Sequence, residues 1–173
     1  MIVRLADTRD LDTIAAFYRQ QGYDPALEAT DQFLMVEDAG MLCGVVRVCR
    51  EQDALVLRGM RVPLEKQRRG IGSRLLLALP PLLADDPCFC IAHAHLRTFY
   101  GQIGFVEIPT AQAPLFLQER IAGYRQDHNV SAILMARPGG RGKVPVTGED
   151  GCPPWPGQRN EVRSTPKKGQ EDT

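Results

Sequence analysis

The chain has 173 residues, 43% of them hydrophobic. This content and length favour one domain with a hydrophobic core, and the chain is too short for two domains of ordinary size. Lys plus Arg and Asp plus Glu each total 21, so the balanced charge argues neither for nor against nucleic-acid binding. The N-terminal segment has no basic region followed by a long apolar core, and no run reaches membrane-spanning length. We expect a soluble, cytoplasmic protein with neither a nucleic-acid nor a membrane partner.

The first half of the chain predicts a strand, a helix and then three more strands. Asp7 or Thr8 can cap the helix, and Gly22 supplies its stop. The helix carries apolar residues at helical spacing between Leu11 and Tyr18. Strands are expected at 2–5, 32–37, 41–50 and 54–62, with one or two further helical turns at 25–30. Tight turns join the last three strands, so they should form an antiparallel meander.

The second half predicts alternating helices and strands. Gly70 opens a Leu-rich helix, which Pro80 and Pro81 end or kink because proline removes a helix donor. A short turn at 82–84 should follow. Further strands are expected at 88–93, 105–108 and 131–136, and further helices at 96–102 and 115–125.

The composition changes at Pro138. From there to Thr173 glycine and proline are frequent, apolar residues are sparse and charges follow no period. Such a segment cannot bury enough apolar surface to offset its ordering entropy, so we predict a folded domain at 1–137 and a disordered tail at 138–173. Trp155 lies among prolines and is either a docking motif or part of an inert tail, and the inert tail is favoured.

Four of the five cysteines lie in apolar runs that resemble strands, and we expect buried, reduced thiols. Cys88 and Cys90 would share one face of a strand and could form half of a metal site. No second Cys or His pair at ligand spacing accompanies them. We therefore expect no metal.

The stretch from Met60 to Leu76 has the pattern of a strand, a charged loop and a helix. The first N–H groups of a helix lack intrahelical partners, and the helix dipole adds partial positive charge there. Glycine at 70 and 72 would let the backbone approach an anion closely, and Arg68 and Arg69 add cations. The stretch therefore predicts a site for a ligand with a pyrophosphate group.

Two motifs and the order of the elements resemble the GCN5-related N-acetyltransferase (GNAT) family. Residues 67–72, Gln-Arg-Arg-Gly-Ile-Gly, are similar to the family's acetyl-CoA motif Gln/Arg-x-x-Gly-x-Gly/Ala. Residues 99–105, Phe-Tyr-Gly-Gln-Ile-Gly-Phe, are similar to its motif Phe-Tyr-x-x-x-Gly-Phe. The resemblance covers about residues 1–137. It implies an α+β fold with a central, mostly antiparallel sheet of six to seven strands flanked by helices.

The resemblance implies an N-acetyltransferase that moves an acetyl group from acetyl-CoA to a primary amine by direct attack. Main-chain groups of Met60, Arg61 and Val62 would hold the pantetheine arm. Tyr100 would be the general acid toward the CoA thiolate, as a phenol within hydrogen-bond reach can be. The acceptor would be a small molecule or a peptide, and a homodimer stays open. The pyrophosphate would contact the turn formed by Arg68, Arg69, Gly70, Ile71, Gly72 and Ser73.

The general base is not evident from the sequence. Many members of the family carry a carboxylate on the central strands, but residues 54–62 contain none. Glu51 and Asp53 lie at the far turn, where we expect solvated surface. His93 occupies a position where many members have Asn, and His93 or His95 could take an ammonium proton. A water relay, or an amine that arrives neutral, would need no dedicated base.

The acceptor is not identified either. Arg47, Arg58 and Arg61 could meet an anionic substrate or the cofactor, or be ordinary surface charge. The long segment 109–129 is expected to form part of the acceptor wall, because such loops carry specificity. The alternative function is a catalytically inactive CoA-binding domain that serves as a regulatory or interaction module.

Overall fold

The computed structural model describes residues 1–127 and 131–139. The tail predicted to be disordered lies outside these residues except for Pro138 and Gly139, and Trp155 lies outside them too. Seven strands run through the described residues: β1 (Ile2–Leu5), β2 (Gln32–Asp38), β3 (Met41–Glu51), β4 (Ala54–Arg61), β5 (Cys88–His93), β6 (Val106–Glu107) and β7 (Ala132–Arg137). The helices are α1 (Leu11–Gln20), α2 (Ile71–Ala78), α3 (Pro80–Leu83), α4 (Arg97–Gly101) and α5 (Leu115–Asp127).

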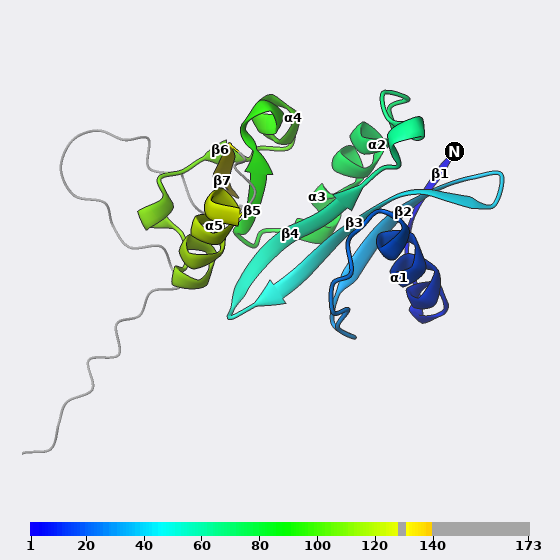
Figure 1. Cartoon of the computed structure of the whole chain (residues 1–173), viewed down its shortest axis with the longest axis horizontal. Helices are drawn as coiled ribbons and strands as arrows, with labels where there is room; N and C mark the ends of the chain where they lie inside the picture. Colours follow the sequence, from blue (N-terminus) through cyan, green and yellow to red (C-terminus); the bar gives the residue numbers. More distant parts are fainter. Residues whose placement is uncertain (128–130, 140–173) are drawn as a thin grey trace, which may run out of the picture.

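The strands form one sheet in the order β1-β2-β3-β4-β5-β7-β6 (Figure 1). Neighbouring strands are antiparallel except for β4 and β5, which run parallel. The crossover between these two carries α2 and α3. This arrangement confirms the predicted α+β fold with a mostly antiparallel sheet, including the meander of β2, β3 and β4.

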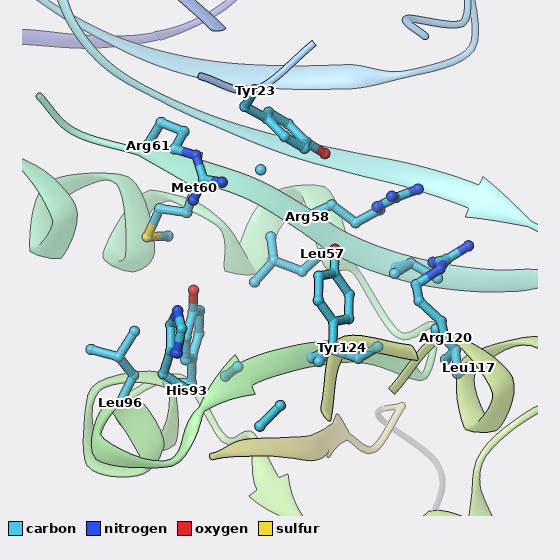
Figure 2. Close-up of a pocket in the computed structure, with 16 residues that line it drawn as sticks. Tyr23, Leu57, Arg58, Met60, Arg61, His93, Leu96, Leu117, Arg120 and Tyr124 are labelled. Atoms are coloured by element: carbon cyan, nitrogen blue, oxygen red, sulfur yellow. The ribbon is translucent and has the colours of Figure 1, made fainter. Parts of the chain in front are cut away.

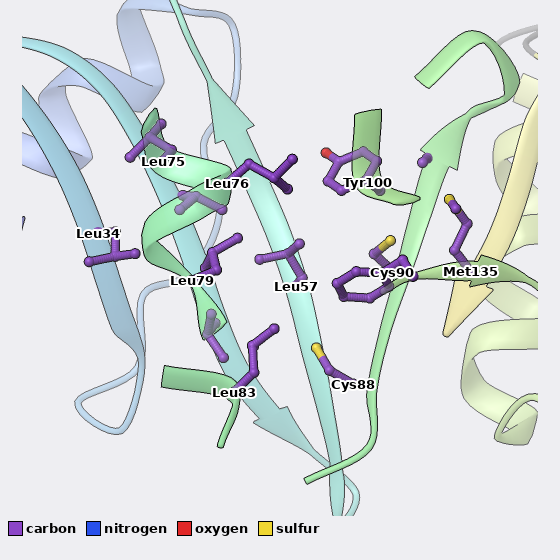
Figure 3. Close-up of a cluster of buried hydrophobic side chains, with 14 of the residues drawn as sticks. Leu34, Leu57, Leu75, Leu76, Leu79, Leu83, Cys88, Cys90, Tyr100 and Met135 are labelled. Carbon is purple, nitrogen blue, oxygen red and sulfur yellow. The ribbon is translucent and has the colours of Figure 1, made fainter. Parts of the chain in front are cut away.

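The helices cover both faces of the sheet, because its strands alternate apolar residues between two cores. One core joins α2, α3 and α4 to one face, with Leu34, Leu57 and Cys90 among its strand residues (Figure 3). On the opposite face, α1 packs on β2 and β3, and α5 packs on β5 and β7. The central strands on that second face lie between α1 and α5.

Two local predictions need correction. Residues 25–30 were expected to form helical turns, but they form none and end in a hydrogen-bonded turn at Glu28–Asp31. Pro25 provides no helix donor, and the segment instead crosses the sheet face beside Arg47. The helix predicted at 96–102 is shorter, because a 3-10 turn at Ala94–Leu96 precedes α4.

Strands β4 and β5 pair over a short length and then separate. Their register includes only Leu55 with Cys88 and Val56 with Phe89, although β4 continues to Arg61 and β5 to His93. Beyond these pairs, no strand of the described residues bonds the edge of β4 that faces β5. The sheet therefore opens in its middle, between the part formed by β1–β4 and the part formed by β5–β7.

Gly44 lets α2 lie close to β3. A Cβ at this position would lie 2.7 Å from Cγ2 of Ile71 and 3.3 Å from Cδ1 of Leu75. Ile71 is the first residue of α2. The absence of a side chain at Gly44 thus sets how close the N-terminal end of α2 lies to the sheet.

A buried ion pair fixes the segment that follows α1. Nη2 of Arg47 lies 2.7 Å from Oδ2 of Asp31, and the two side chains are 5% and 1% exposed. The same carboxylate oxygen accepts a hydrogen bond from the backbone N–H of Glu28. Arg47 was a candidate for surface charge or for a ligand contact; the structure shows that it is buried and paired.

A second set of ion pairs joins the two parts of the sheet. Glu51, at the end of β3, accepts hydrogen bonds from Arg58 on β4 at 2.7 Å and from Arg120 on α5 at 2.5 Å. The thiol of Cys49 donates to the same carboxylate at 3.2 Å. Burial disfavours the ionised form of Glu51, but these hydrogen bonds outweigh it and lower its pKa to about 2. The expectation of solvated surface is wrong for Glu51 and is confirmed for Asp53, which is exposed.

We predict that Asp31→Ala lowers the free energy of unfolding by about 3–5 kcal/mol, because it leaves the Arg47 guanidinium buried without a counter-charge. The double variant Arg47→Met, Asp31→Leu should regain most of that loss. Asp86→Ala is the matched control, since Asp86 and Arg50 form an ion pair whose side chains are both 54% exposed. Its effect should stay below about 1 kcal/mol in urea unfolding. Equal losses for Asp31→Ala and Asp86→Ala would contradict the prediction.

We also predict that the wild-type chain is more stable than the Glu51→Gln variant, by a difference in unfolding free energy that depends on pH. The pKa of Glu51 is lower in the folded than in the unfolded chain, so its carboxylate stabilises the fold above the unfolded value and loses that effect as protons bind. The advantage should be about 2–3 kcal/mol at pH 7 and decline between about pH 5 and pH 2. Urea unfolding of both proteins across this range measures it, and a difference that does not vary with pH would contradict it.

Candidate active site

A cleft of about 350 Å³ opens where β4 and β5 separate (Figure 2). One wall is the run 56–61 of β4, and the opposite wall is 91–93 of β5. Six consecutive residues of a strand line a cavity only when its backbone edge, rather than one face, forms the wall. The cleft is completed by Tyr23, Leu96, Tyr100, Leu117, Arg120, Tyr124 and Ala132.

The β4 wall contains a bulge. Arg47 pairs with Arg58 and Val45 with Arg61, so Gly59 and Met60 together stand opposite the single residue between the two β3 positions. A bulge leaves its extra residue outside the ladder and bends the strand. Gly59 has a φ of 57°, and its carbonyl accepts a hydrogen bond from the Tyr18 hydroxyl at 2.9 Å. Helix α1 thus holds the bulge in place, and Met60 and Arg61, two predicted cofactor contacts, lie in the cleft wall.

The turn predicted to bind pyrophosphate lies at the N-terminus of α2. Gly70 has a φ of 78° and Arg68 a φ of 59°, so the turn contains two left-handed residues. The first helical hydrogen bond runs from the N–H of Arg74 to the carbonyl of Gly70 at 3.0 Å. The N–H groups of Ile71, Gly72 and Ser73 precede it and lack intrahelical acceptors. The turn therefore presents a set of free donors of the kind that anions bind.

The turn is anchored to the end of β4. Nε2 of Gln67 donates to the carbonyl of Val62 at 3.1 Å. Val62, the third predicted cofactor contact on this strand, thus lies between the cleft wall and the turn, and it follows the last residue of β4. The strand wall and the turn before α2 are therefore consecutive parts of one segment.

Tyr100 lines the cleft and is only 9% exposed. Its ring packs edge-on against Phe99 and Phe105, with centroids 5.1 and 6.2 Å away, and lies near Leu76 and Cys90 (Figure 3). Burial raises the pKa of its phenol, so Tyr100 stays protonated near neutral pH. This position and protonation state suit a hydrogen-bond donor inside the cleft.

His93 ends β5 on the opposite wall of the cleft and is exposed. Its ring stacks on His95, with centroids 5.5 Å apart and an interplanar angle of 23°. His93 lines the cleft whereas His95 is not among the residues that do. Of the two predicted base candidates, only His93 therefore lines the same cleft as Tyr100.

Among the charged and aromatic cleft residues, three were not singled out from the sequence as individual site residues: Arg120, Tyr124 and Tyr23. Arg120 and Tyr124 lie on α5, within the segment expected to form the acceptor wall. Their spacing of four residues places them on one helix face, the only sequence signal for them. Tyr23 contacts Arg61, whose guanidinium carbon lies 4.9 Å from the centre of its ring.

The four cysteines in the described residues are buried and unpaired, as predicted. Across residues 1–127 and 131–139, no three His, Cys, Asp or Glu side chains gather as a metal site would require. Within the same residues, the helices are too short or too polar to cross a bilayer.

Solved structures similar to this chain share its fold at low sequence identity. The ribosomal-protein-S18-alanine N-acetyltransferase from Escherichia coli has a TM-score of 0.58 and 16% identity, covering 85% of this chain and 100% of that one. Escherichia coli ElaA has a TM-score of 0.56 and 17% identity, covering 79% of this chain and 99% of that one. N-acetylglutamate synthase from Neisseria gonorrhoeae was solved with coenzyme A and N-acetyl-glutamate. It has a TM-score of 0.55 and 17% identity, covering 79% of this chain and 35% of that one.

A search of curated protein sequences gave no match. A family model described as the acetyltransferase (GNAT) domain matches residues 6–113, more than half of the chain. The match spans the bulge of β4, the turn before α2 and the motif around Tyr100. It agrees with the sheet order, the opening between β4 and β5, and the fold shared with the solved structures. The chain therefore belongs to the GNAT family of acetyltransferases.

Proposed function

We propose that the chain transfers an acetyl group from acetyl-CoA to a primary amine of a small molecule or peptide by direct attack. The observation that carries this proposal is the separation of β4 from β5 directly beside the anion-binding turn of α2. An extended ligand could lie along the open edge of β4 and reach the turn with its phosphates. The domain would be 1–137, acting in the cytoplasm.

The residues present fit coenzyme A. The free N–H groups after Gly70, with Arg68 and Arg69, would contact the pyrophosphate, and the backbone of Met60, Arg61 and Val62 would bond the pantetheine amides. Apart from the adjoining residues of the chain, no atom of the described residues lies within 4 Å of a Cβ placed at Gly70, so this side of the turn is open to a ligand. Acetyl-CoA would supply an activated thioester, and we propose no metal.

The chain's own groups would assist both halves of the transfer. A neutral amine forms the new C–N bond while the C–S bond breaks and sulfur takes the electron pair. Backbone N–H groups at the β4 bulge would donate to the thioester oxygen, where negative charge develops. Tyr100 would donate its phenol hydrogen to the leaving sulfur. Burial makes this phenol a weak acid but keeps it protonated until the thiolate forms.

His93 would accept the proton that the amine loses. It lies in the cleft wall opposite β4, and its exposure gives a path for that proton to solvent. Glu51 is bonded to Arg58 of the β4 wall, but it is held ionised by two arginines and its pKa of about 2 makes it a poor base. His93 is therefore the base that we favour.

We predict that Gly70→Val weakens coenzyme A binding at least about tenfold. A left-handed residue with a side chain is strained by about 1–2 kcal/mol, and relief of that strain would move the turn's N–H groups. Calorimetric titration with coenzyme A measures the affinity.

Gly40→Val is the matched control for this prediction. Gly40 has a φ of 76° and, apart from its chain neighbours, no atom of the described residues within 4 Å of a Cβ placed on it. It lies in the turn between β2 and β3 and is not part of the cleft lining. Both variants should lose similar stability, and only Gly70→Val should lose affinity. Unchanged affinity in Gly70→Val would contradict the role of the turn.

We predict that Tyr100→Phe lowers kcat by about 10²-fold and leaves the KM for acetyl-CoA nearly unchanged, because it removes only the proton donor. The ring contacts with Phe99 and Phe105 remain possible, so thermal unfolding should change little. Thiol release from acetyl-CoA measures the rate. Full activity would remove Tyr100 from the mechanism.

The same assay separates the proposal from its rival, an inactive CoA-binding module. Coenzyme A affinity and thiol release are measured together across a panel of amines and peptides. Binding with turnover on at least one of them supports the transferase. Binding without turnover on any member would favour the regulatory or interaction module.

A further inference from the structure

One end of the cleft is basic. Arg58 and Arg120 lie together there with Tyr124, whereas Met60 and His93 lie toward the other end (Figure 2). Three arginines, the third being Arg61, line the cleft, and no Asp or Glu is among the described residues that do. A cleft with this lining favours a ligand that carries negative charge.

The carboxylate bonded to the cleft arginines neutralises only part of their positive charge. Glu51 is the carboxylate bonded to both Arg58 and Arg120, so one negative charge serves two guanidinium groups. Arg61 lies over the ring of Tyr23, a contact that stabilises a cation without neutralising it. The three cleft arginines and Glu51 together carry a net charge of about +2 at neutral pH.

The two arginines at the basic end are held in position with donors to spare. Arg58 bonds Glu51 through Nη1 and Arg120 bonds it through Nη2, while a guanidinium has five N–H donors. Their side chains are 26% and 27% exposed, so a ligand can reach them in an environment that screens charge poorly. Two fixed guanidinium groups of this kind match the planar geometry of a carboxylate.

The basic end belongs to the face of the sheet opposite the anion-binding turn. Arg58 shares a face of β4 with Val56, which packs with the core under α5, whereas Leu57 packs with the core under α2. The turn that would hold pyrophosphate begins α2. Arg58 and Arg120 therefore lie on the side from which a second substrate could enter while the first lies along β4.

We propose that the acceptor is a small primary amine that also carries a carboxylate. The carboxylate would bind Arg58 and Arg120, and the amine would point toward Tyr100 and His93. This inference rests on the proposed acetyl transfer, whose acceptor it specifies. The ring of Tyr124, an exposed residue of the cleft lining, would contact the carbon skeleton between the two ends.

The test compares acceptors that differ only in the carboxylate. Leucine, leucinamide and 3-methylbutylamine form one set, and 6-aminohexanoate with 6-aminohexanamide forms a second in which the charge is far from the amine. Each is assayed for thiol release at saturating acetyl-CoA. At least one acid should exceed its neutral partner in kcat/KM by at least about tenfold, and its advantage should shrink as salt is raised.

Variants test whether the two arginines cause this preference. Arg58→Gln and Arg120→Gln should each raise the KM for the preferred acid at least about tenfold and leave the KM for its amide within about twofold. Arg19→Gln is the matched control, because Arg19 is an exposed residue of α1 outside the cleft. It should change neither value. The amide assay and thermal unfolding on the same preparations detect any loss of fold.

The outcomes separate this inference from the proposed function. Equal use of acids and amides, or a preference that survives in both arginine variants, would overturn the inference and leave acetyl transfer intact. Turnover of none of these amines or of any peptide, with coenzyme A still bound, would overturn the proposed function and the inference with it. A preference for the acid that is lost only in the two arginine variants would support both.

Discussion

The early separation of β4 from β5 is the constraint on which the rest of the molecule depends. These strands share two paired positions, and a short distance beyond them β4 contains the bulge at Gly59 and Met60, a feature that bends a strand. Tyr18 bonds the carbonyl of Gly59, so the first helix holds the bend. A backbone edge that would otherwise be paired is thereby left open inside the fold, where a ligand's amide groups can bond it.

The two faces of the sheet present different groups on either side of this opening. On one face, Gly44 lets α2 come close, and the turn before α2 presents its N–H groups. On the other, Glu51 gathers Arg58 and Arg120 across the gap and joins the two parts of the sheet. The same carboxylate that stabilises the open sheet also orients the two guanidinium groups, so stability and ligand selection share one set of ion pairs at this place.

Much of the fold could be predicted from the sequence, because its signals are local. The strands at 2–5 and 88–93 match in both bounds, and the motifs around Gly70 and Tyr100 identified the family. The features that could not be predicted depend on contacts between residues far apart in the sequence. Nothing near Glu51 in sequence shows that Arg120, 69 residues later, will bond its carboxylate. The separation of β4 from β5 is likewise a property of pairing between strands, which neither strand's own pattern contains.

The reactivity of two buried cysteines of β5, Cys88 and Cys90, affects which side reactions a thioester could undergo in this protein. Burial raises the pKa of Cys88 to about 12 and that of Cys90 well above its ordinary value, and Cys90 packs in the same core as Tyr100. Acyl capture and thiol–disulfide exchange both require a thiolate. Cys88 and Cys90, which lie outside the cleft lining, would therefore not compete with the acceptor amine for the acyl group of the proposed thioester.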